Sequence, residues 1–296
     1  MVEELGSILR NGFETWKKNL NICLPFVFSL LLTLIVGAIV LGGALITVIG
    51  PVLPSLTPSL TSTPGEIPPE IVQQLQPLLL QNIDILVAAV IIAGILVLLI
   101  TTFFSAGAIG MANEATKTGS TRLTDMTDYG ARKFMSLLGA NLIVALIALA
   151  GVIFLIPGLV PLLPAIATSQ TPLDATNMAA IAMLVVGFLV MALYLLIISI
   201  IFAIPPYAVV ISDLGAVDGV KRGFQFFMAH KVEVFLLWLV VLVIAVVASI
   251  ILGNIPYIGQ WLSMAISVII IEPLSVIWWS RLYLSGTEGE VEPAEF

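Results

Sequence analysis

Six long apolar stretches limit what this sequence can fold into. They cover residues 22–49, 83–111, 137–165, 178–210, 234–252 and 258–282. A helix needs about 20 mostly apolar residues to cross the hydrocarbon core of a bilayer, and each stretch meets that length. With 60% hydrophobic and 10% charged residues among 296, the chain has too few polar groups to cover its surface in water. The sequence therefore predicts an all-α membrane protein with six transmembrane helices.

The basic residues give the orientation of these helices. All 11 Lys and Arg residues lie before the first stretch, between the second and third, between the fourth and fifth, or at the end of the sixth. The three remaining connections contain none, and two of them are acidic, with Glu66, Glu70 and Asp174. Positively charged connections stay in the cytoplasm. We therefore expect a multi-pass protein of the cell membrane with its N- and C-termini on the cytoplasmic side.

The three basic segments that precede odd-numbered stretches share one pattern. Each places apolar residues at a spacing of three or four, which is typical of an amphipathic helix in the membrane interface. These residues are Leu5, Ile8, Leu9, Phe13, Trp16 and Leu20; Leu123, Met126, Phe134 and Leu137; and Leu214, Val217, Phe224 and Phe227. Each segment also holds a central glycine, at Gly12, Gly130 and Gly223. The pattern predicts a three-fold repeat of one interfacial helix and two spans.

The predicted domain organisation follows from this repeat. Residues 1–285 form a single six-span membrane domain with repeats 1–116, 117–212 and 213–285, and residues 286–296 form an acidic cytoplasmic tail. Residues 51–82 form a long Pro-rich external loop, because prolines exclude regular helix there. This loop has two interpretations: a flexible connection with a short surface helix, or an element that docks a partner.

Glu272 is the residue that most strongly suggests a functional site. It lies eleven residues after Trp261 and nine before Arg281, which places it near the bilayer centre. An ionisable side chain at that depth costs at least about 2.5–3.5 kcal/mol, so a functional role is the first hypothesis. The low dielectric of the bilayer favours the neutral, protonated form of the Glu272 carboxyl. Pro273 follows directly and is expected to kink the helix.

Two interpretations of Glu272 remain open. It is either a proton- or cation-handling group in a cavity at a broken helix, or a protonated carboxyl that bonds a neighbouring helix. The neighbours that the sequence offers are Asn141, Tyr194 and Ser199. A second pair of candidate helix breaks, Pro205 and Pro206, stands in the fourth stretch, where the freed backbone groups require protein or water as partners.

Several classes of function find no support in the sequence. The single cysteine, Cys23, has no partner for a disulfide, and the single histidine, His230, completes no metal-ligand set. The net charge of −7 argues against a nucleic-acid partner. No catalytic signature such as GxSxG or HExxH occurs. We therefore expect no catalytic, cofactor or metal site, and no enzyme activity.

The C-terminal end carries a resemblance. Glu272-Pro273, the run Trp278-Trp279-Ser280-Arg281-Leu282-Tyr283 and an acidic Gly/Glu tail occur together. In these features, and in the repeated basic helix before a Leu-rich span, the chain resembles prokaryotic, notably archaeal, six-helix membrane proteins of unknown function. That group is similar to the membrane domain of some glycerophosphodiester phosphodiesterases. The relatives often carry an aromatic-acidic pair where this chain has Tyr283-Leu284-Ser285. The resemblance implies the fold and no active-site residues.

Two hypotheses about function follow. The first is a protein that transports or senses a solute or lipid through a cavity near Glu272. The second is a structural or adaptor protein that organises partners in the membrane without transport. In both cases the expected partners are membrane lipids, together with a second copy of the chain or another membrane protein.

Overall fold

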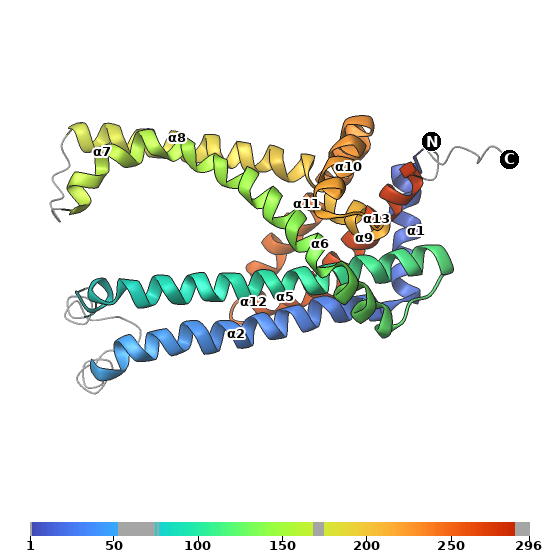
Figure 1. The fold of residues 1–296 in the computed structure, drawn as a ribbon, viewed down its shortest axis with the longest axis horizontal. Coiled ribbons are helices and arrows are strands. Elements are labelled where there is room, and N and C mark those ends of the chain that lie inside the picture. Colours follow the sequence, from blue (N-terminus) through green and yellow to red (C-terminus); the bar gives the residue numbers. More distant parts are fainter. Residues whose placement is uncertain (1, 53–74, 76, 168–174, 288–296) are drawn as a thin grey trace. The chain divides into compact units, whose positions relative to one another are not determined.

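A computed structural model describes residues 2–52, 75, 77–167 and 175–287. All regular secondary structure in these residues is helical. Most of the predicted external loop, 51–82, and of the predicted acidic tail, 286–296, lies outside the described residues. In chain order the elements are α1 (Leu5–Lys18), η1 (Leu20–Cys23), α2 (Leu24–Ile49), η2 (Gly50–Val52), α5 (Ile83–Thr118), α6 (Leu123–Leu149), η3 (Ala150–Leu155), α7 (Ile156–Ala167), α8 (Ala175–Ile201), α9 (Pro205–Ile211), α10 (Ala216–Ala229), α11 (Lys231–Gly253), α12 (Gly259–Ile266), η4 (Ser267–Ile271) and α13 (Glu272–Thr287) (Figure 1).

The expectation of six long apolar helices is confirmed. Among the described residues, six segments are long and apolar enough to cross a membrane. They are Leu20–Val52, Ile83–Thr118, Leu123–Leu163, Met178–Ile211, Lys231–Gly253 and Gly259–Thr287. Each contains or closely overlaps one apolar stretch of the sequence, because a continuous apolar run satisfies its backbone groups only as a helix in lipid.

The three predicted interfacial helices differ in the structure. α1 ends at Asn19 (φ −130°, ψ 58°) and α10 ends at His230 (φ −127°, ψ 45°), so both are separate from the span that follows. The segment before the third span does not form a helix of its own. Residues 123–137 form the first turns of α6, which continues without a break to Leu149. Leucine has a higher helix propensity than asparagine or histidine. The helix accordingly continues through Leu137, whereas helices end before Asn19 and His230.

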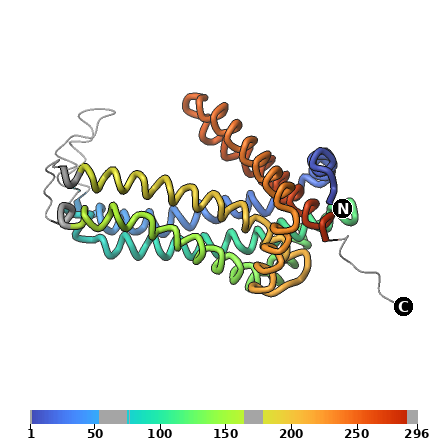
Figure 2. The backbone as a smooth tube through the Cα atoms, turned by 90° about the horizontal axis from the view of Figure 1, so that it is seen from above, coloured from blue at the N-terminus to red at the C-terminus, as the bar shows by residue number. Residues whose placement is uncertain are grey.

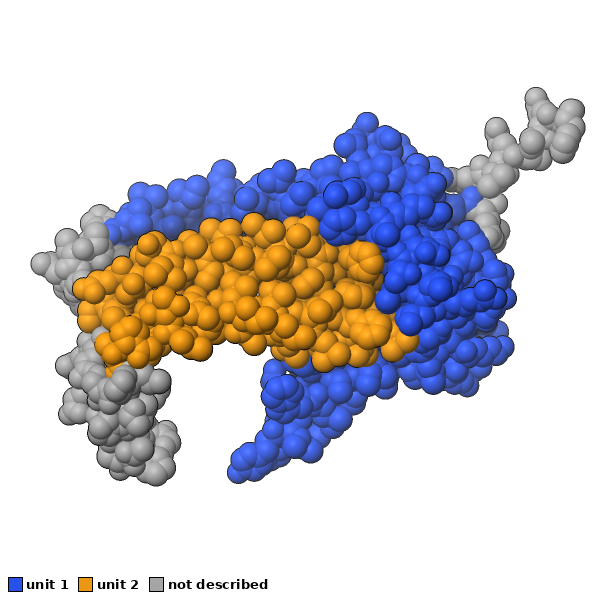
Figure 3. All heavy atoms as spheres, turned by 60° about the horizontal axis from the view of Figure 1, so that its bottom comes forward, with its two compact units in different colours: residues 1–23, 106–296 blue, residues 24–105 orange. Residues whose placement is uncertain are grey.

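The chain divides into two compact units (Figure 3). One unit contains Leu24–Ser105, and the other contains Met1–Cys23 together with Ala106–Phe296. In the smaller unit, α2 and the first part of α5 run antiparallel (Figure 1). The ring of Phe28 near the start of α2 lies 6.2 Å from the ring of Phe104, near the end of that part of α5. These boundaries do not coincide with the predicted repeats.

In the larger unit, α7 packs along α8 (Figure 2). Two glycines permit this close approach. A Cβ on Gly158 would lie 2.4 Å from the backbone nitrogen of Leu184, and a Cβ on Gly187 would lie 2.2 Å from the carbonyl oxygen of Phe154 in η3, directly before α7. Any larger residue at either position would force the two backbones apart.

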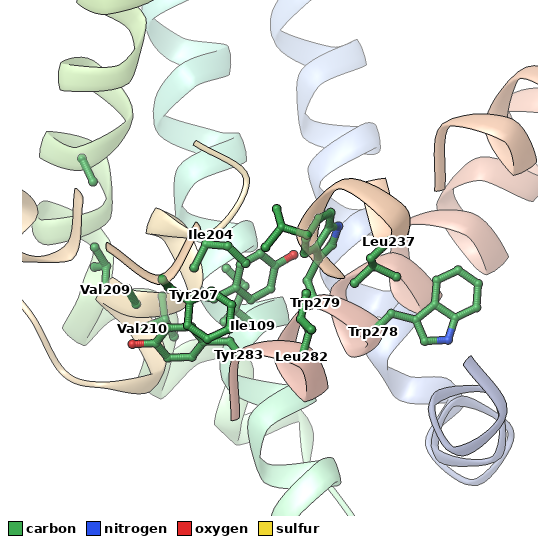
Figure 4. Packing of buried hydrophobic residues seen from close by; sticks show 14 of the residues in the cluster. Ile109, Ile204, Tyr207, Val209, Val210, Leu237, Trp278, Trp279, Leu282 and Tyr283 are labelled. Carbon is green, nitrogen blue, oxygen red and sulfur yellow. The ribbon is translucent and has the colours of Figure 1, made fainter. Parts of the chain in front are cut away.

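The hydrophobic core of the larger unit gathers at one end of its spans. It includes Ile109 in α5, Tyr207 in α9, Leu237 in α11 and Trp279 in α13 (Figure 4). Leu137 near the middle of α6 belongs to the same core. This is the end at which the chain carries its Lys and Arg residues. The rings of Tyr207 and Trp279 lie 6.4 Å apart within the core. The amphipathic helices α1 and α10 complete the core with Ile8 and Phe226.

Candidate functional site

Glu272 stands directly after a widened helical turn. η4 (Ser267–Ile271) is a π-helical segment between α12 and α13. The backbone N–H of Glu272 donates to the carbonyl oxygen of Ser267, five residues earlier, instead of the residue four earlier. π-Helical turns inside α-helices are uncommon and are frequent at functional sites. The sequence predicts a kink from Pro273 but not this wider turn.

Pro273 explains a second feature of the same turn. Proline has no N–H, so the carbonyl group of Ile269, four residues earlier, loses its ordinary helical donor. The thiol of Cys23 takes that place, with Sγ 3.1 Å from the carbonyl oxygen of Ile269. Cys23 is buried and lies at the end of η1. It therefore satisfies the backbone group that the proline leaves without a partner.

The carboxyl of Glu272 is half-buried and weakly held by its own helix. The hydroxyl of Ser267 donates to Oε1 of Glu272 over 3.4 Å, whereas a strong hydrogen bond between two oxygens is 2.5–3.0 Å long. Because this bond is long, it limits the movement of the carboxyl very little.

Two of the residues that the sequence offers as partners of Glu272 use their hydroxyls for other hydrogen bonds. The hydroxyl of Tyr194 on α8 donates to the carbonyl oxygen of Ile147 on α6 over 2.6 Å. Ser199 donates to the carbonyl oxygen of Leu196 in its own helix over 2.7 Å. Asn141 is half-buried on α6. The structure thus uses Tyr194 to join α6 to α8, and the hydroxyls of Tyr194 and Ser199 bond backbone carbonyls instead of Glu272.

Pro205 and Pro206 stand where the fourth span breaks. α8 ends at Ile201, three non-helical residues follow, and α9 begins at Pro205. The helix α10 packs against this break. A Cβ on Gly223 would lie 2.6 Å from the nitrogen of Pro205, so α10 touches the broken span with its backbone. This break is therefore a packing element.

A polar cluster at the basic end was missed by the sequence analysis. Nη2 of Arg281 lies 3.0 Å and 3.2 Å from the two carboxylate oxygens of Glu3. The side-chain amide of Asn11 donates to the same carboxylate over 2.8 Å. These bonds connect the N-terminal segment and α1 to α13. No local signal predicts them, because Glu3 and Arg281 are separated by almost the whole sequence.

Two cavities adjoin this cluster. One has a volume of about 330 Å³ and is lined by Glu3, Thr116, Lys117, Arg281, Leu284 and Ser285. The other has a volume of about 280 Å³ and is lined by Asn11, Glu14, Thr15, Lys18, Ala115, Thr116, Gly119 and Arg281. Thr116 and Arg281 line both.

The neighbouring charges are partly paired. The Lys17 ammonium donates to the Glu14 carboxylate over 2.9 Å, and this hydrogen bond, supported by the charge of Lys17, holds the pKa of Glu14 below its ordinary value. On α6, Lys133 is buried and forms an ion pair with Asp213 in the turn before α10. Asp213 adopts a positive φ of 58°. This pair connects α6 to the α9–α10 turn.

The described residues contain no group of three or more His, Cys, Asp or Glu side chains that could hold a metal ion. Two polar arrangements in the described part of the chain are the most suited to a ligand: a weakly held carboxyl at a π-helical turn, and a cluster of donors around Arg281.

Comparison with known proteins places this architecture in a family. A family model described as a domain of unknown function, DUF7847, matches residues 32–278. An uncharacterized protein of Archaeoglobus fulgidus is 24% identical over 298 residues, which covers 96% of each chain. No solved structure matches the chain. These findings confirm the kinship with archaeal membrane proteins of unknown function, while the similarity to a phosphodiesterase membrane domain stays a prediction. The chain belongs to the DUF7847 family and is a polytopic membrane protein of unknown function.

Proposed function

We propose that this protein transports or senses a small solute or a lipid, and that Glu272 is the proton- or cation-handling group of that process. The observation that carries the proposal is the π-helical turn directly before Glu272 and Pro273. Discontinuous helices near the bilayer midplane form the substrate and ion sites of many transporters.

The chemistry of the turn supports this role. A carboxyl in the membrane is costly, and a chain that keeps one without a function would gain stability from losing it. Ser267 holds the carboxyl only by a long hydrogen bond of 3.4 Å. The carboxyl is therefore free to exchange a proton or to bind a cation when water reaches it. The thiol of Cys23 and the carbonyl of Ser267 keep the backbone satisfied while this happens.

The proposal includes an orientation and a repeat. Both termini lie in the cytoplasm, and the protein is in the cell membrane. Residues 1–116, 117–212 and 213–285 are three copies of one unit. The packing of the amphipathic segments supports this repeat, since each docks on the inner end of the second span of another copy. α1 packs on α13, the start of α6 packs on the end of α5, and α10 packs on α9.

A close glycine contact occurs at each of these three docking sites. A Cβ on Gly12 would lie 2.3 Å from Cδ1 of Trp278, and a Cβ on Gly223 would lie 2.6 Å from the nitrogen of Pro205. A Cβ on Gly110 in α5 would lie 2.1 Å from the Tyr129 ring in α6. In the first two contacts the glycine belongs to the amphipathic helix, and in the third it belongs to the span. Close docking of an amphipathic segment at all three sites is the expected result of a repeated unit.

We further propose that the protein acts without catalysing a reaction and without a cofactor. The support is the lack of any recognised catalytic signature in the sequence.

Proton flux into liposomes tests the role of Glu272. Purified protein is reconstituted with a pH-sensitive dye inside the liposomes, and flux is measured under an imposed pH gradient and membrane potential. We expect Glu272→Gln to abolish flux, because the amide keeps the shape of the carboxyl and cannot carry a proton. Asp218→Asn, an exposed acid in the first turn of α10, is the matched control and should retain flux. A folded Glu272→Gln variant with unchanged flux, or a wild-type protein without any flux, refutes the proton-handling role.

A second candidate function, the organisation of a membrane-protein partner or a second copy of the chain, is favoured by a different observation. An apolar groove of about 370 Å³ lies along α7 and α8, lined by Phe154, Pro157, Ala182, Met183, Val186, Gly187 and Val190. Val186→Trp should fill this groove and abolish any oligomer seen by native mass spectrometry. Val247→Trp, on an exposed position of α11, should not. Equal effects of the two variants would exclude the groove as the interface.

A further inference from the structure

We infer that the cluster around Arg281 is a binding site for a phosphate group, separate from Glu272. The site lies between α1, the end of α5 and the end of α13, where the two polar cavities share Thr116 and Arg281. The larger cavity, at about 330 Å³, lies at the lower end of the range of small-ligand sites, which begins near 300 Å³. A phosphate monoester is the ligand that its donors fit.

Two of the buried donors without a partner belong to this site. Among the described residues, no hydrogen-bond acceptor reaches Nε of Arg281 or Oγ1 of Thr116. A buried donor without a partner costs about 1–3 kcal/mol, so such groups usually have a ligand or ordered water. The Arg281 and Thr116 donors both belong to residues that line the two cavities.

Thr116 differs from other threonines of the protein in this respect. The hydroxyls of Thr15, Thr101 and Thr118 donate to the backbone carbonyl four residues earlier in their own helices. Thr118 is in the same helix as Thr116, so the helix itself permits that bond. The hydroxyl of Thr116 makes no such bond, although its residue lines both cavities.

The charges around the site favour an anion. Glu3 is neutralised by Arg281, and Glu14 is neutralised by Lys17. Lys18 and Lys117 line the cavities and are exposed, and neither forms an ion pair with a described residue. The surplus of positive charge and the free Nε–H of a guanidinium match the oxygens of a phosphate, which arginine binds in a fixed geometry.

Two sources supply a phosphate group at this position. One is the headgroup of an anionic lipid, since basic residues at the edge of a span attract such headgroups. The other is a free phosphate or a small phosphate ester in water. Leu284 lines the same cavity as Lys117 and offers an apolar wall for a lipid chain.

Binding measurements with two probes test the inference. Inorganic phosphate is titrated into detergent-purified protein by calorimetry. In parallel, binding of phosphatidic acid is measured in phosphatidylcholine nanodiscs with and without that lipid. Four single variants are compared with the wild type: Thr116→Val, Arg281→Lys, Lys117→Gln and, as the control, Lys221→Gln. Lys221 is an exposed lysine of α10 outside both cavities.

We expect Thr116→Val and Arg281→Lys to weaken phosphate binding at least about tenfold, because each removes a hydrogen bond to a charged group. Lys117→Gln should weaken binding more at low salt than at high salt, and Lys221→Gln should bind like the wild type. Binding of phosphatidic acid alone, with the same dependence on the variants, assigns the site to a lipid headgroup.

Two results overturn the inference: no binding of either probe by the wild type, or equal binding by the wild type, Thr116→Val and Lys117→Gln. Thr116→Val preserves the shape of the side chain, so it keeps the test decisive if Arg281→Lys does not fold. The proton-flux assay of Glu272→Gln is independent of this site, so either proposal can fail alone.

Discussion

The docking of α1 on α13 provides a quantitative test of the packing. α1 contains two glycines in different surroundings. A Cβ on Gly12 would lie 2.3 Å from Cδ1 and 2.7 Å from Nε1 of Trp278, whereas a Cβ on Gly6 would meet nothing within 4 Å. The indole of Trp278 is 6% exposed, and its Nε1 donates to the carbonyl oxygen of Leu9 over 3.2 Å. The same substitution, glycine to alanine, is therefore expected to act in opposite directions within one helix.

The magnitude follows from these contacts. Ordinary contact begins near 3.4 Å, so Gly12→Ala must displace the Trp278 indole by about 1 Å, and overpacking of that kind costs about 1–3 kcal/mol. The displaced indole loses its hydrogen bond, which costs about 1 kcal/mol more. Alanine gains about 1 kcal/mol in helix propensity over glycine. The net destabilisation for Gly12→Ala is about 1–3 kcal/mol. Gly6→Ala should be neutral or stabilise by up to about 1 kcal/mol.

Pulse proteolysis in mild detergent with increasing SDS measures the difference. Trypsin sites at Arg10, Lys17 and Lys18 lie in α1, so undocking of this helix exposes them first. We expect earlier cleavage in Gly12→Ala and unchanged or later cleavage in Gly6→Ala. Trp278→Phe should relieve the clash and reduce the effect of Gly12→Ala in the double variant. Equal stability of the two alanine variants, or no relief by phenylalanine, would show that Gly12 is not the contact that sets this docking.

Three further predictions concern charge and topology. Asparagine adopts a positive φ as readily as aspartate, so Asp213→Asn keeps the backbone but leaves the buried Lys133 without its ion-pair partner. The free energy of unfolding in SDS should therefore fall by about 1–3 kcal/mol. An unchanged unfolding midpoint would contradict this. Glu14 has a lowered pKa because of Lys17, so its small contribution is present at neutral pH and is lost as the pH falls through the lowered value. An NMR titration should therefore show a higher Glu14 midpoint in Lys17→Gln. Ser62→Cys, in the predicted external loop, should react with an impermeant maleimide from outside the cell, and labelling only after the membrane is opened would reverse the orientation.

The six spans could be predicted from sequence because length and apolar composition are local properties. The interfacial helices were predicted less accurately, and the difference depends on single residues. Asn19, Leu137 and His230 each stand seven residues after the central glycine of their segment. Asn19 and His230 end a helix, and Leu137 continues one. The common apolar pattern hides this difference in helix propensity.

The surroundings of Glu272 were harder to predict for a physical reason. Pro273 signals a break in the helix, but the sequence does not say whether the backbone widens, bends or ends there. The thiol of Cys23 reaches the carbonyl of Ile269 from another span. The cluster of Glu3 and Arg281 likewise depends on the return of the first helix to the last. Such contacts are decided by packing, which periodicity and composition do not encode.

The confinement of the core to one end of the larger unit has a consequence for the bilayer around it. In the apolar windows of five of the six spans, only 6–11% of the residues are buried. Acyl chains therefore solvate most side chains in these windows, and the far ends of the spans lie mostly in lipid, although α7 packs along α8 there. A thicker or thinner membrane can then change the tilt of these ends at small cost, while the docked helices at the basic end stay packed. Membrane thickness is therefore expected to change the tilt of the spans more than the packing at the basic end.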